Sequence, residues 1–520
     1  MKKGGYDSTL PVIHMLLNRF PSVLLILMNL MFYVQYPAQC LVSLLFSIAK
    51  KGRAAKSFNV RGIQMRTSFA CVFDRVLDAR LDLWLPISDE QSAYQKLKST
   101  LNHIFTLRLL IALAKHYKKP LYIGFFDIAK AFERVSRLIL FKKLVKIGIS
   151  QCMLRALQLC YTMTTCIVTS GGEYSTPFFT SSGIRQGAKS SAKLFIYFID
   201  GLIQSLKANC SPEDVLGDLH SLLHADDTAI VSMSEKLFVK KCNIMIAYFA
   251  EHKLSLNIGK SGYMVINGND SVKTGIQLNS GVLSYVSSYV YLGYIITDTG
   301  SLQTDINKHV VSKRSNSTIK FINFCRVNST APIWIKFRVL DACANSAYLY
   351  GCEVWGDSNY SKLDTLHRKA IRTALSVRQS VNNEIVYVES GEMPLTYTIK
   401  SRQLKFWLKM KDFLETHQDS YLHKLVSLAR QKGIPYIKFY DSLVSQYESP
   451  SNCATVLRNQ FQDSMSCKFN DAIGKDSNSK LGVYKQINPD RSILSHSDLP
   501  EFERAKITRY HCGSHYLEVE

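Results

Sequence analysis

Three aspartates carry the clearest chemical signal in this 520-residue chain. Asp127 follows a short apolar run at residues 121–126, and Asp226 and Asp227 lie between apolar residues in the stretch LLHADDTAIV. Carboxylates at the end of one strand and at the tip of a neighbouring hairpin can converge on two Mg²⁺ ions about 4 Å apart. Such ions activate an attacking hydroxyl group and stabilise a leaving oxygen. The pattern therefore predicts a two-metal site for phosphoryl transfer.

Local patterns predict the elements that position these aspartates. Residues 121–126 have the length and aromatic content of a strand, and residues 222–231 have the pattern of a tight hairpin. Helical spacing over residues 129–147 places Phe132, Val135, Leu138 and Leu144 on related faces, with Gly148 as the end of the helix. We also expect a hairpin over residues 167–180, helices over residues 194–206 and up to His252, a strand pair in YVYLGYIIT, and mainly helices from Asp305 onward.

The composition is that of a globular protein with a polyanionic partner. Hydrophobic residues make up 47% of the chain, and 64 Lys and Arg against 41 Asp and Glu give a net charge of +23. Neutralising phosphates with such residues releases counterions, which favours binding to nucleic acid. The 13 cysteines include no C-x-x-C pair, and no secretory signal is evident, which indicates reduced thiols in an intracellular protein.

Residues 20–49 carry no charged side chain and raise the question of a membrane anchor. A spanning helix needs about 20 mainly apolar residues. Asn29, Gln35, Pro37 and Gln39 divide this stretch into two shorter pieces. We therefore expect a buried helix or strand in each piece and no membrane, with a membrane-attached protein as the alternative.

Several motifs in consistent order resemble the reverse transcriptases of non-LTR retrotransposons, of the animal long-interspersed-element kind. FDIAKAFERV resembles F-x-D-x-x-K-A-F-D-x-V, and SSGIRQGAKSSAKLFIYFID resembles G-V-R-Q-G-C-P-L-S-P-x-L-F-x-x-Y. HADD takes the place of the Y/F-A-D-D box, LSLNIGKSGYMVI resembles L-N-x-x-K-T, and YVYLGYIIT resembles the Y-L-G primer-grip strand. Upstream, AKKGRAAKSFNVRGIQM and EQSAYQKLKSTLNHIFTLR resemble segments of the fingers.

This resemblance implies an α+β fold of the right-hand polymerase type. The expected domains are the fingers over residues 1–115, a palm with the catalytic carboxylates over 116–300, a helical thumb over 301–400 and a mostly helical C-terminal extension over 401–520. The implied activity is RNA-directed DNA polymerisation from dNTPs, with an RNA template, a DNA primer and two Mg²⁺ ions, or Mn²⁺ in their place. Both ends look truncated relative to the family, so we expect an endonuclease to come from another chain. The family also implies a nuclear phase, with the cytoplasm as the alternative.

Catalytic roles carry over by position. Asp127 and Asp226 would hold both metals with help from the Ile128 carbonyl group, and Asp227 would add negative charge beside them. Lys260 would lie near the pyrophosphate and could donate a proton to it.

The resemblance also implies how the nucleotide is bound. The ring of Phe132 would be a steric gate that fills the space of a ribose 2′-hydroxyl group. Gln186 would lie against the incoming nucleotide, and the preceding Arg185 would also belong to the nucleotide-binding set. Gly187 would let the backbone approach closely.

Further binding residues are expected upstream and downstream of the palm. Lys50 and Arg61 match the positions in the fingers that clamp the triphosphate. Leu292 and Gly293 would lie under the primer terminus. A basic helix from Asn307 would be the thumb, which tracks the duplex backbone without reading its sequence.

The chain also departs from the family pattern. His224 replaces the usual aromatic residue, AKSSA replaces C-P-L-S-P with loss of both prolines and gain of Lys189, and Gln95 replaces an arginine. The last change weakens the triphosphate clamp unless Lys96 or Lys98 compensates. Two hypotheses stay open: an active polymerase, whose fidelity these changes could alter, and a catalytically inactive nucleic-acid-binding remnant.

Overall fold

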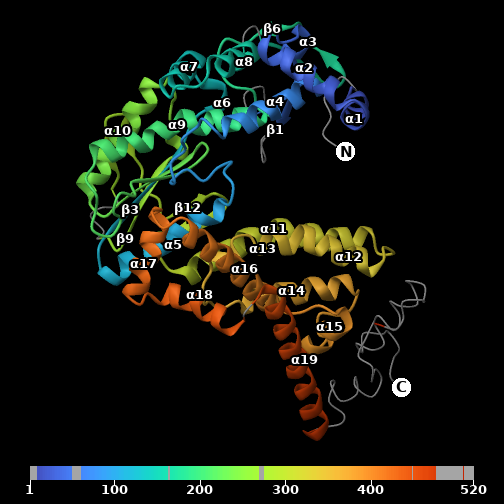
Figure 1. Ribbon diagram of the computed structural model, residues 1–520. Helices are drawn as coiled ribbons and strands as arrows, with labels where there is room; N and C mark the ends of the chain where they lie inside the picture. Colours follow the sequence, from blue (N-terminus) through green and yellow to red (C-terminus); the bar gives the residue numbers. More distant parts are fainter. Residues whose placement is uncertain are drawn as a thin grey trace. The chain divides into compact units, whose positions relative to one another are not determined.

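The structure is a computed structural model that describes residues 9–49, 60–161, 164–268, 274–447 and 449–475, together with Thr508. The chain divides into two compact units (Figure 1), one of residues 1–100 and 120–286 and the other of residues 101–119 and 287–520. The first unit mixes helices with two main sheets, and the second is mostly helical. The predicted α+β class with a helical C-terminal region is confirmed.

A four-stranded antiparallel sheet in the order β7-β8-β3-β9 positions the aspartates of the first unit. Its central strand β3 consists of apolar residues and Gly124 up to a terminal aspartate, and every residue before that aspartate is buried. Such a continuous apolar run suits a strand that is covered on both faces. The strands are β3 (Leu121–Asp127), β7 (Ser221–His224), β8 (Asp227–Ser232) and β9 (Gly262–Ile266).

A second sheet of the first unit joins the N-terminal part of the chain to the predicted hairpin at residues 167–180. Its order is β2-β1-β4-β5, with β6 paired to β4, and β1 runs parallel to β4. The hairpin is confirmed. The strands are β1 (Val42–Ala49), β2 (Val60–Met65), β4 (Thr165–Ser170), β5 (Glu173–Tyr174) and β6 (Phe178–Phe179), and a small separate pair consists of β10 (Ile276–Leu278) and β11 (Gly281–Leu283).

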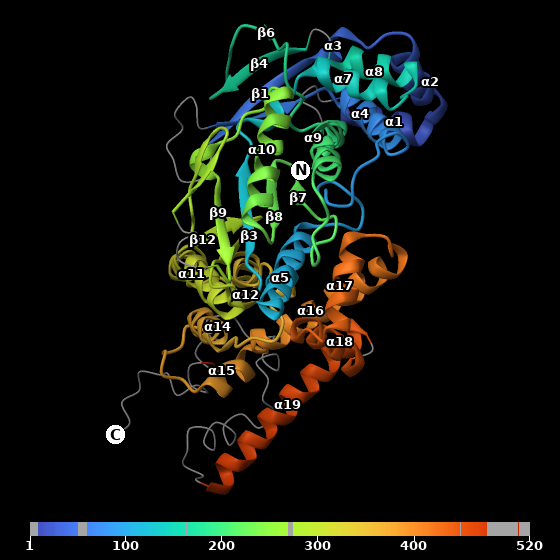
Figure 2. The ribbon, with the colours of Figure 1, turned by 90° about the vertical axis from the view of Figure 1, so that its left-hand side faces the viewer.

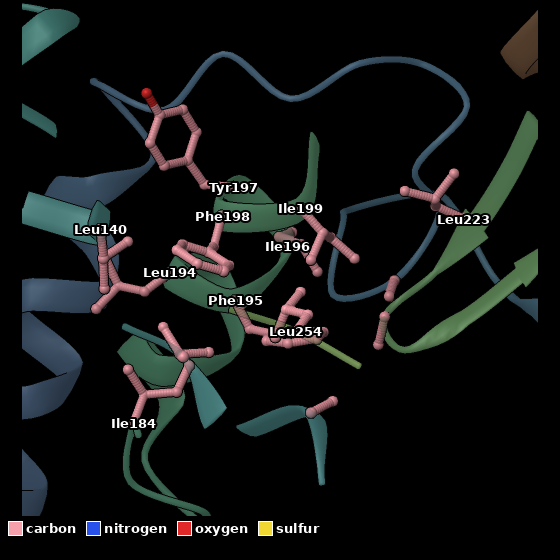
Figure 3. Close-up of a cluster of buried hydrophobic side chains, with 14 of the residues drawn as sticks. Leu140, Ile184, Leu194, Phe195, Ile196, Tyr197, Phe198, Ile199, Leu223 and Leu254 are labelled. Atoms are coloured by element: carbon pink, nitrogen blue, oxygen red, sulfur yellow. The ribbon is translucent and has the colours of Figure 1, made fainter. Parts of the chain in front are cut away.

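The long helix α9 (Lys189–Asn209) forms the centre of the core in the first unit. Figure 3 shows its apolar side chains, Leu194 to Ile199, among residues from other elements such as Leu140 and Leu223. Next to it, α10 (Glu235–Glu251) packs on β8 and β3 (Figure 2). The other helices of this unit are α1 (Leu10–Arg19), α2 (Pro21–Tyr33), α3 (Ala38–Leu41), α4 (Ser68–Leu81), α6 (Ala131–Arg134), α7 (Arg137–Lys146), α8 (Gln151–Tyr161) and the short 3₁₀ turn Ile258–Lys260.

The helix predicted over residues 129–147 is two helices, α6 and α7, with a break at Val135 and Ser136. The carbonyl groups of Phe132 and Val135 accept hydrogen bonds from the N–H groups of Ile184 and Gly183, at 2.9 Å each. Because these carbonyl groups bind a loop that is distant in sequence and not the next turn of the same helix, the helix is interrupted here. The predicted common face is also wrong at Leu138, which is 64% exposed.

The uncharged stretch of residues 20–49 forms α2, α3 and β1. The prediction of two short pieces is confirmed, because the first piece is the helix α2 and the second contains the strand β1. The prediction of burial is only half right, because α2 buries residues such as Leu24 and Met28 while Leu25 and Ile26 on its other face are 61% and 58% exposed. Among the described residues, no single helix has the length and apolar character to span a membrane. The pair α1 and α2 meets both criteria only when taken together, and it is bent by 119°.

The second unit is built from helices around an aromatic core. Phe105 on α5 (Thr100–Tyr117) contacts the rings of Trp407, Tyr436 and Tyr440. The predicted strand pair is confirmed as β12 (Ser288–Tyr291) and β13 (Tyr294–Thr297). The helices that follow are α11 (Leu302–Val327), α12 (Ile333–Val339), a π-helical stretch (Leu340–Asn345), α13 (Ser346–Tyr348), a 3₁₀ turn (Cys352–Val354), α14 (Ser361–Ala374), α15 (Asn383–Ser390), α16 (Leu395–Thr416), α17 (Tyr421–Gln431), α18 (Pro435–Gln446) and α19 (Pro450–Lys475).

A two-unit division is coarser than the four predicted domains. It places α5 and the β12–β13 hairpin with the helical unit. The predicted boundaries at residues 115, 300 and 400 stay predictions.

Candidate active site

The register of β3 and β8 brings two of the three aspartates together. Asp127 is the last residue of β3, and its Cα pairs directly with that of Asp227, the first residue of β8. Because directly opposite side chains of an antiparallel pair project from the same face, these two carboxylates start from adjacent positions. The apolar run before Asp127 is buried, so the carboxylate emerges where the strand leaves the core.

Asp226 lies in the two-residue turn between β7 and β8. His224 pairs with Asp227, which leaves Ala225 and Asp226 as the loop, and Ala225 has a φ of +55°. Two-residue hairpin turns require such left-handed backbone. The buried Gln91 side chain supports the turn, because its Oε1 accepts a hydrogen bond from the Ala225 N–H at 3.2 Å.

The residue before the turn, His224, is held by a neighbouring segment. Its Nδ1 lies 2.8 Å from the Ser92 hydroxyl oxygen, and burial lowers the pKa of the imidazole. The ring is therefore neutral near pH 7 and behaves as a half-buried strand residue.

The segment after β7 and β8 supplies two partners for the first aspartate. Asn257 Nδ2 donates to Asp127 Oδ2 at 3.2 Å, and its N–H donates to the Asp127 carbonyl at 2.8 Å. Lys260 Nζ lies 3.4 Å from the same Oδ2, with its side chain 65% exposed. An exposed pair of this kind adds little stability, and the lysine brings a positive charge next to the carboxylate.

A cavity of about 940 Å³ joins these groups to the loop before α9. From the predicted set, its lining includes Asp127, Ile128, Phe132, Gln186, Gly187, Asp226 and Lys260. The ring of Phe132 is stacked on Phe195, with centroids 4.5 Å apart and planes at 16°. Gly187 has a φ of +107°, and a Cβ there would lie 3.1 Å from the Gln64 carbonyl oxygen, so this close approach needs a glycine.

Residues 48–296, which include this whole site, match the family model described as "Reverse transcriptase (RNA-dependent DNA polymerase)". This stretch of the chain is therefore similar to reverse transcriptase domains. A retrovirus-related Pol polyprotein from the type-1 retrotransposable element R2 of Popillia japonica is 24% identical over 217 residues. That match covers 41% of this chain and 30% of the polyprotein, so this chain corresponds to less than a third of the relative's length.

Solved structures give weaker matches. An apo telomerase from Candida tropicalis, truncated from its C-terminal domain, is 14% identical with a TM-score of 0.36, covering 51% of this chain and 55% of that one. A telomerase from Candida albicans in complex with a fragment of telomeric RNA is 12% identical with a TM-score of 0.35, covering 74% and 65%. Similarity at this level supports no inference about function.

One predicted nucleotide contact of the reverse transcriptase domain is corrected by the structure. Arg185 is 3% exposed and does not line the cavity. Its guanidinium donates to the Cys160 carbonyl group and lies 5.6 Å from the ring centroid of Tyr161. The motif places this arginine next to Gln186 in sequence, but the backbone directs its side chain into the interior.

Several predicted site residues are not among those that line this cavity, or lie outside the described residues. Lys50 lies outside the described residues, and Arg61 is described only as a strand residue whose Cα pairs with that of Ile48. Leu292 and Gly293 belong to the second unit, where they form the two-residue turn between β12 and β13 with φ values of +50° and +80°. Asp227 pairs with Asp127 but is not among the cavity-lining residues.

Neither lysine proposed to compensate for Gln95 lines the cavity. Lys98 is 11% exposed and its Nζ lies 2.9 Å from Asp89 Oδ1, which occupies its charge. Gln95 itself donates through Nε2 to the Gln91 carbonyl at 2.8 Å. Within the described residues, this segment therefore supports the hairpin and brings no lysine to the cavity.

Sequence reasoning gave no role to Gln91, Asn257 or Tyr94, which also shape the site. Gln91 holds the hairpin turn, Asn257 holds Asp127, and Tyr94 lines the cavity with its side chain 57% exposed and a φ of +56°. The signal was present, because Gln91 and Tyr94 belong to the EQSAYQKLK segment and Asn257 belongs to LSLN.

The donor chemistry of the cavity fits a divalent metal. Asp127 and Asp226 offer carboxylate oxygens and Ile128 offers a main-chain carbonyl, and oxygen atoms are the ligands that Mg²⁺ takes. In the part of the chain that the structure describes, no three Asp, Glu, His or Cys side chains come close enough to hold a metal by themselves. Mg²⁺ in polymerase sites is bound by one or two carboxylates together with water and substrate phosphates, and the residues present fit that mode.

Proposed function

We propose that this chain is an RNA-directed DNA polymerase that extends a DNA primer on an RNA template. The observation that carries the proposal is the shared cavity, which collects Asp127, Asp226, Phe132, Gln186 and Lys260 from segments far apart in the sequence. The match to the reverse transcriptase family over residues 48–296 supports the same reaction. Mobile-element polymerases act on chromosomal DNA, so we also propose that the protein has a nuclear phase.

In the proposed reaction, the primer 3′-hydroxyl oxygen forms a bond to the α-phosphorus of a dNTP, and the bond to the bridging oxygen breaks to release pyrophosphate. Asp127 and Asp226, with the Ile128 carbonyl, would hold two Mg²⁺ ions, which when bound activate the hydroxyl group and offset the charge on the leaving oxygen. Asn257 keeps the Asp127 carboxylate oriented. Lys260 would donate a proton to the pyrophosphate.

Positioning and charge stabilisation dominate phosphoryl-transfer catalysis, so loss of the carboxylates should affect rate far more than template binding. The decisive experiment is primer extension on an RNA template by the wild type and by Asp226→Ala/Asp227→Ala, with binding of the same primer–template measured in parallel. We expect extension by the wild type only and binding by both.

The result that would contradict the proposal is binding by both proteins with extension by neither. That result would identify a nucleic-acid-binding remnant, which is the second hypothesis. Its support is the altered triphosphate clamp, because Gln95 carries no charge and Lys98 is paired with Asp89.

A further inference from the structure

The loop that carries Gln186 into the cavity is held from both sides. Before the glycine, the Gln186 carbonyl accepts a hydrogen bond from the Gln64 N–H at 3.0 Å, which ties the loop to β2. After the glycine, α9 begins at Lys189, and its first residues form hydrogen bonds to α4. The position of Gln186 in the cavity therefore depends on how firmly the first turn of α9 is fixed.

A single buried carboxylate on α4 fixes that turn. Asp74 is 5% exposed, and its Oδ2 accepts the N–H of Lys189 at 2.7 Å while its Oδ1 accepts the Ser190 hydroxyl group. Arg66, which follows β2, donates from Nη2 to the same Oδ2 at 3.2 Å. Asp74 thus connects the start of α9 to the end of β2, the two segments that flank Gln186.

Both loop donors occur where the chain departs from the reverse transcriptase pattern. The family has C-P-L-S-P where this chain has AKSSA, so Lys189 stands for a proline and Ser190 for a leucine. Proline has no N–H group and leucine has no hydroxyl group, so neither hydrogen bond to Asp74 could form with the family residues. A proline at the first position of a helix would instead preset the backbone without any partner.

We propose that Asp74 is a positioning residue for Gln186, and that its hydrogen bonds to Lys189 and Ser190 replace the rigidity that prolines give this loop in related enzymes. The part of this proposal that concerns nucleotide binding rests on the proposed function. Hydrogen bonds to a buried charged group are stronger than those between neutral groups. Loss of one such bond also costs free energy because a buried polar group is left without a partner. The altered loop is therefore a functional substitute and not a sign of decay.

The test compares Asp74→Ala and the milder Asp74→Asn with the wild type in primer extension. We expect the KM for dNTP to rise about tenfold or more in Asp74→Ala, because two charge-assisted hydrogen bonds to the loop are lost, while kcat changes less than about threefold. A family-like loop, Lys189→Pro/Ser190→Leu, should bring the KM of Asp74→Ala back to within about threefold of the wild type, because its backbone no longer needs the carboxylate.

A matched control separates positioning from general stability. Asp200 lies on the same helix α9, is also 5% exposed, and accepts two hydrogen bonds from Ser88, at 2.9 Å and 2.8 Å. Asp200→Ala should lower the melting temperature without changing the KM for dNTP. Equal KM values for the wild type and Asp74→Ala, or no rescue by the family-like loop, would overturn the proposal.

Hydrogen–deuterium exchange gives a readout that does not need polymerase activity. Residues 183–193 should exchange faster in Asp74→Ala and Asp74→Asn than in the wild type, and recover protection in the family-like loop variant. If the wild type does not extend primers, the proposed function fails, yet the exchange still decides whether Asp74 holds the loop. Unchanged exchange in both Asp74 variants would show that it does not.

Discussion

At the scale of the residue, Phe132 and Asp127 line the same cavity. The ring of Phe132 is stacked on the fully buried Phe195, which fixes its plane. A ring that is locked by packing can exclude a substituent as small as a hydroxyl group, because it cannot move aside without breaking the stack. This geometry supports its predicted role as a steric gate against ribonucleotides.

Replacing Phe132 by valine should open this space. We expect the preference for dNTP over rNTP, as a ratio of kcat/KM values, to fall by about tenfold or more. Contacts with one small substituent of a substrate usually change such a ratio by this amount. Phe141 is the matched control, since it is also partly buried against the same core but lines a different cavity. A Phe141→Val variant with the same loss of preference would contradict the gate.

Arg185 offers the opposite test, because the structure assigns it to the interior. Arg185→Met removes the hydrogen bond to the Cys160 carbonyl and should lower the free energy of unfolding by about 1–3 kcal/mol. Chemical denaturation measures this loss, and extension at low temperature should show an unchanged KM for dNTP. A raised KM for dNTP with an unchanged free energy of unfolding would contradict this assignment and indicate that Arg185 contacts the nucleotide.

At the scale of the element, the stability of β7 depends on a buried, uncharged side chain at the point where the strand begins. His220, directly before β7, is 2% exposed, and burial together with the charge of Lys241 lowers its pKa to about 4. Lys207 acts in the same direction and Asp218 in the opposite one. The strand that leads to Asp226 is therefore anchored by an uncharged imidazole.

This anchor makes stability depend on pH. The unfolded chain binds a proton at this histidine near pH 6.5, whereas the folded protein does so only near pH 4. The unfolded state thus binds more protons below pH 6.5, so stability should fall as the pH drops from about 6.5 to about 4, and this group adds no slope at higher pH. Denaturant unfolding at pH 7.5 and pH 5 measures the difference.

His220→Gln should reduce this acid loss, because the glutamine cannot take up a proton. Some loss should persist, since burial also lowers the pKa of His224, His252 and His367. An unchanged slope in His220→Gln would contradict the assignment.

At the scale of the whole molecule, the net charge of +23 favours the proposed binding to nucleic acid. Each phosphate contact releases counterions, so affinity should fall by about 10³- to 10⁵-fold between 50 and 200 mM salt if six to ten phosphates are contacted. Fluorescence anisotropy with a labelled primer–template measures this slope. The slope should be the same in Asp226→Ala/Asp227→Ala, and a flat salt dependence would argue against a phosphate-tracking surface.

The sequence predicted those features that depend on local patterns. The strand ending at Asp127 and the hairpin around Asp226 follow from apolar runs and turn residues that are contiguous in the chain. The break between α6 and α7 was missed, because it depends on hydrogen bonds from Gly183 and Ile184. The burial of Arg185 was missed for a related reason, since a motif gives the order of residues and not the direction of each side chain.

The turn at Ala225 and Asp226 should not tolerate an inserted residue. A hairpin connection of this size has its own backbone twist, and one extra residue would change the turn type and displace Asp226 from the cavity that it lines together with Asp127. The exposed turn at Asn279 and Ser280, between β10 and β11, carries no such group. In a library of single-residue insertions, variants with an insertion at Asn279 and Ser280 should keep polymerase activity. Variants with an insertion at Ala225 and Asp226 should lose it.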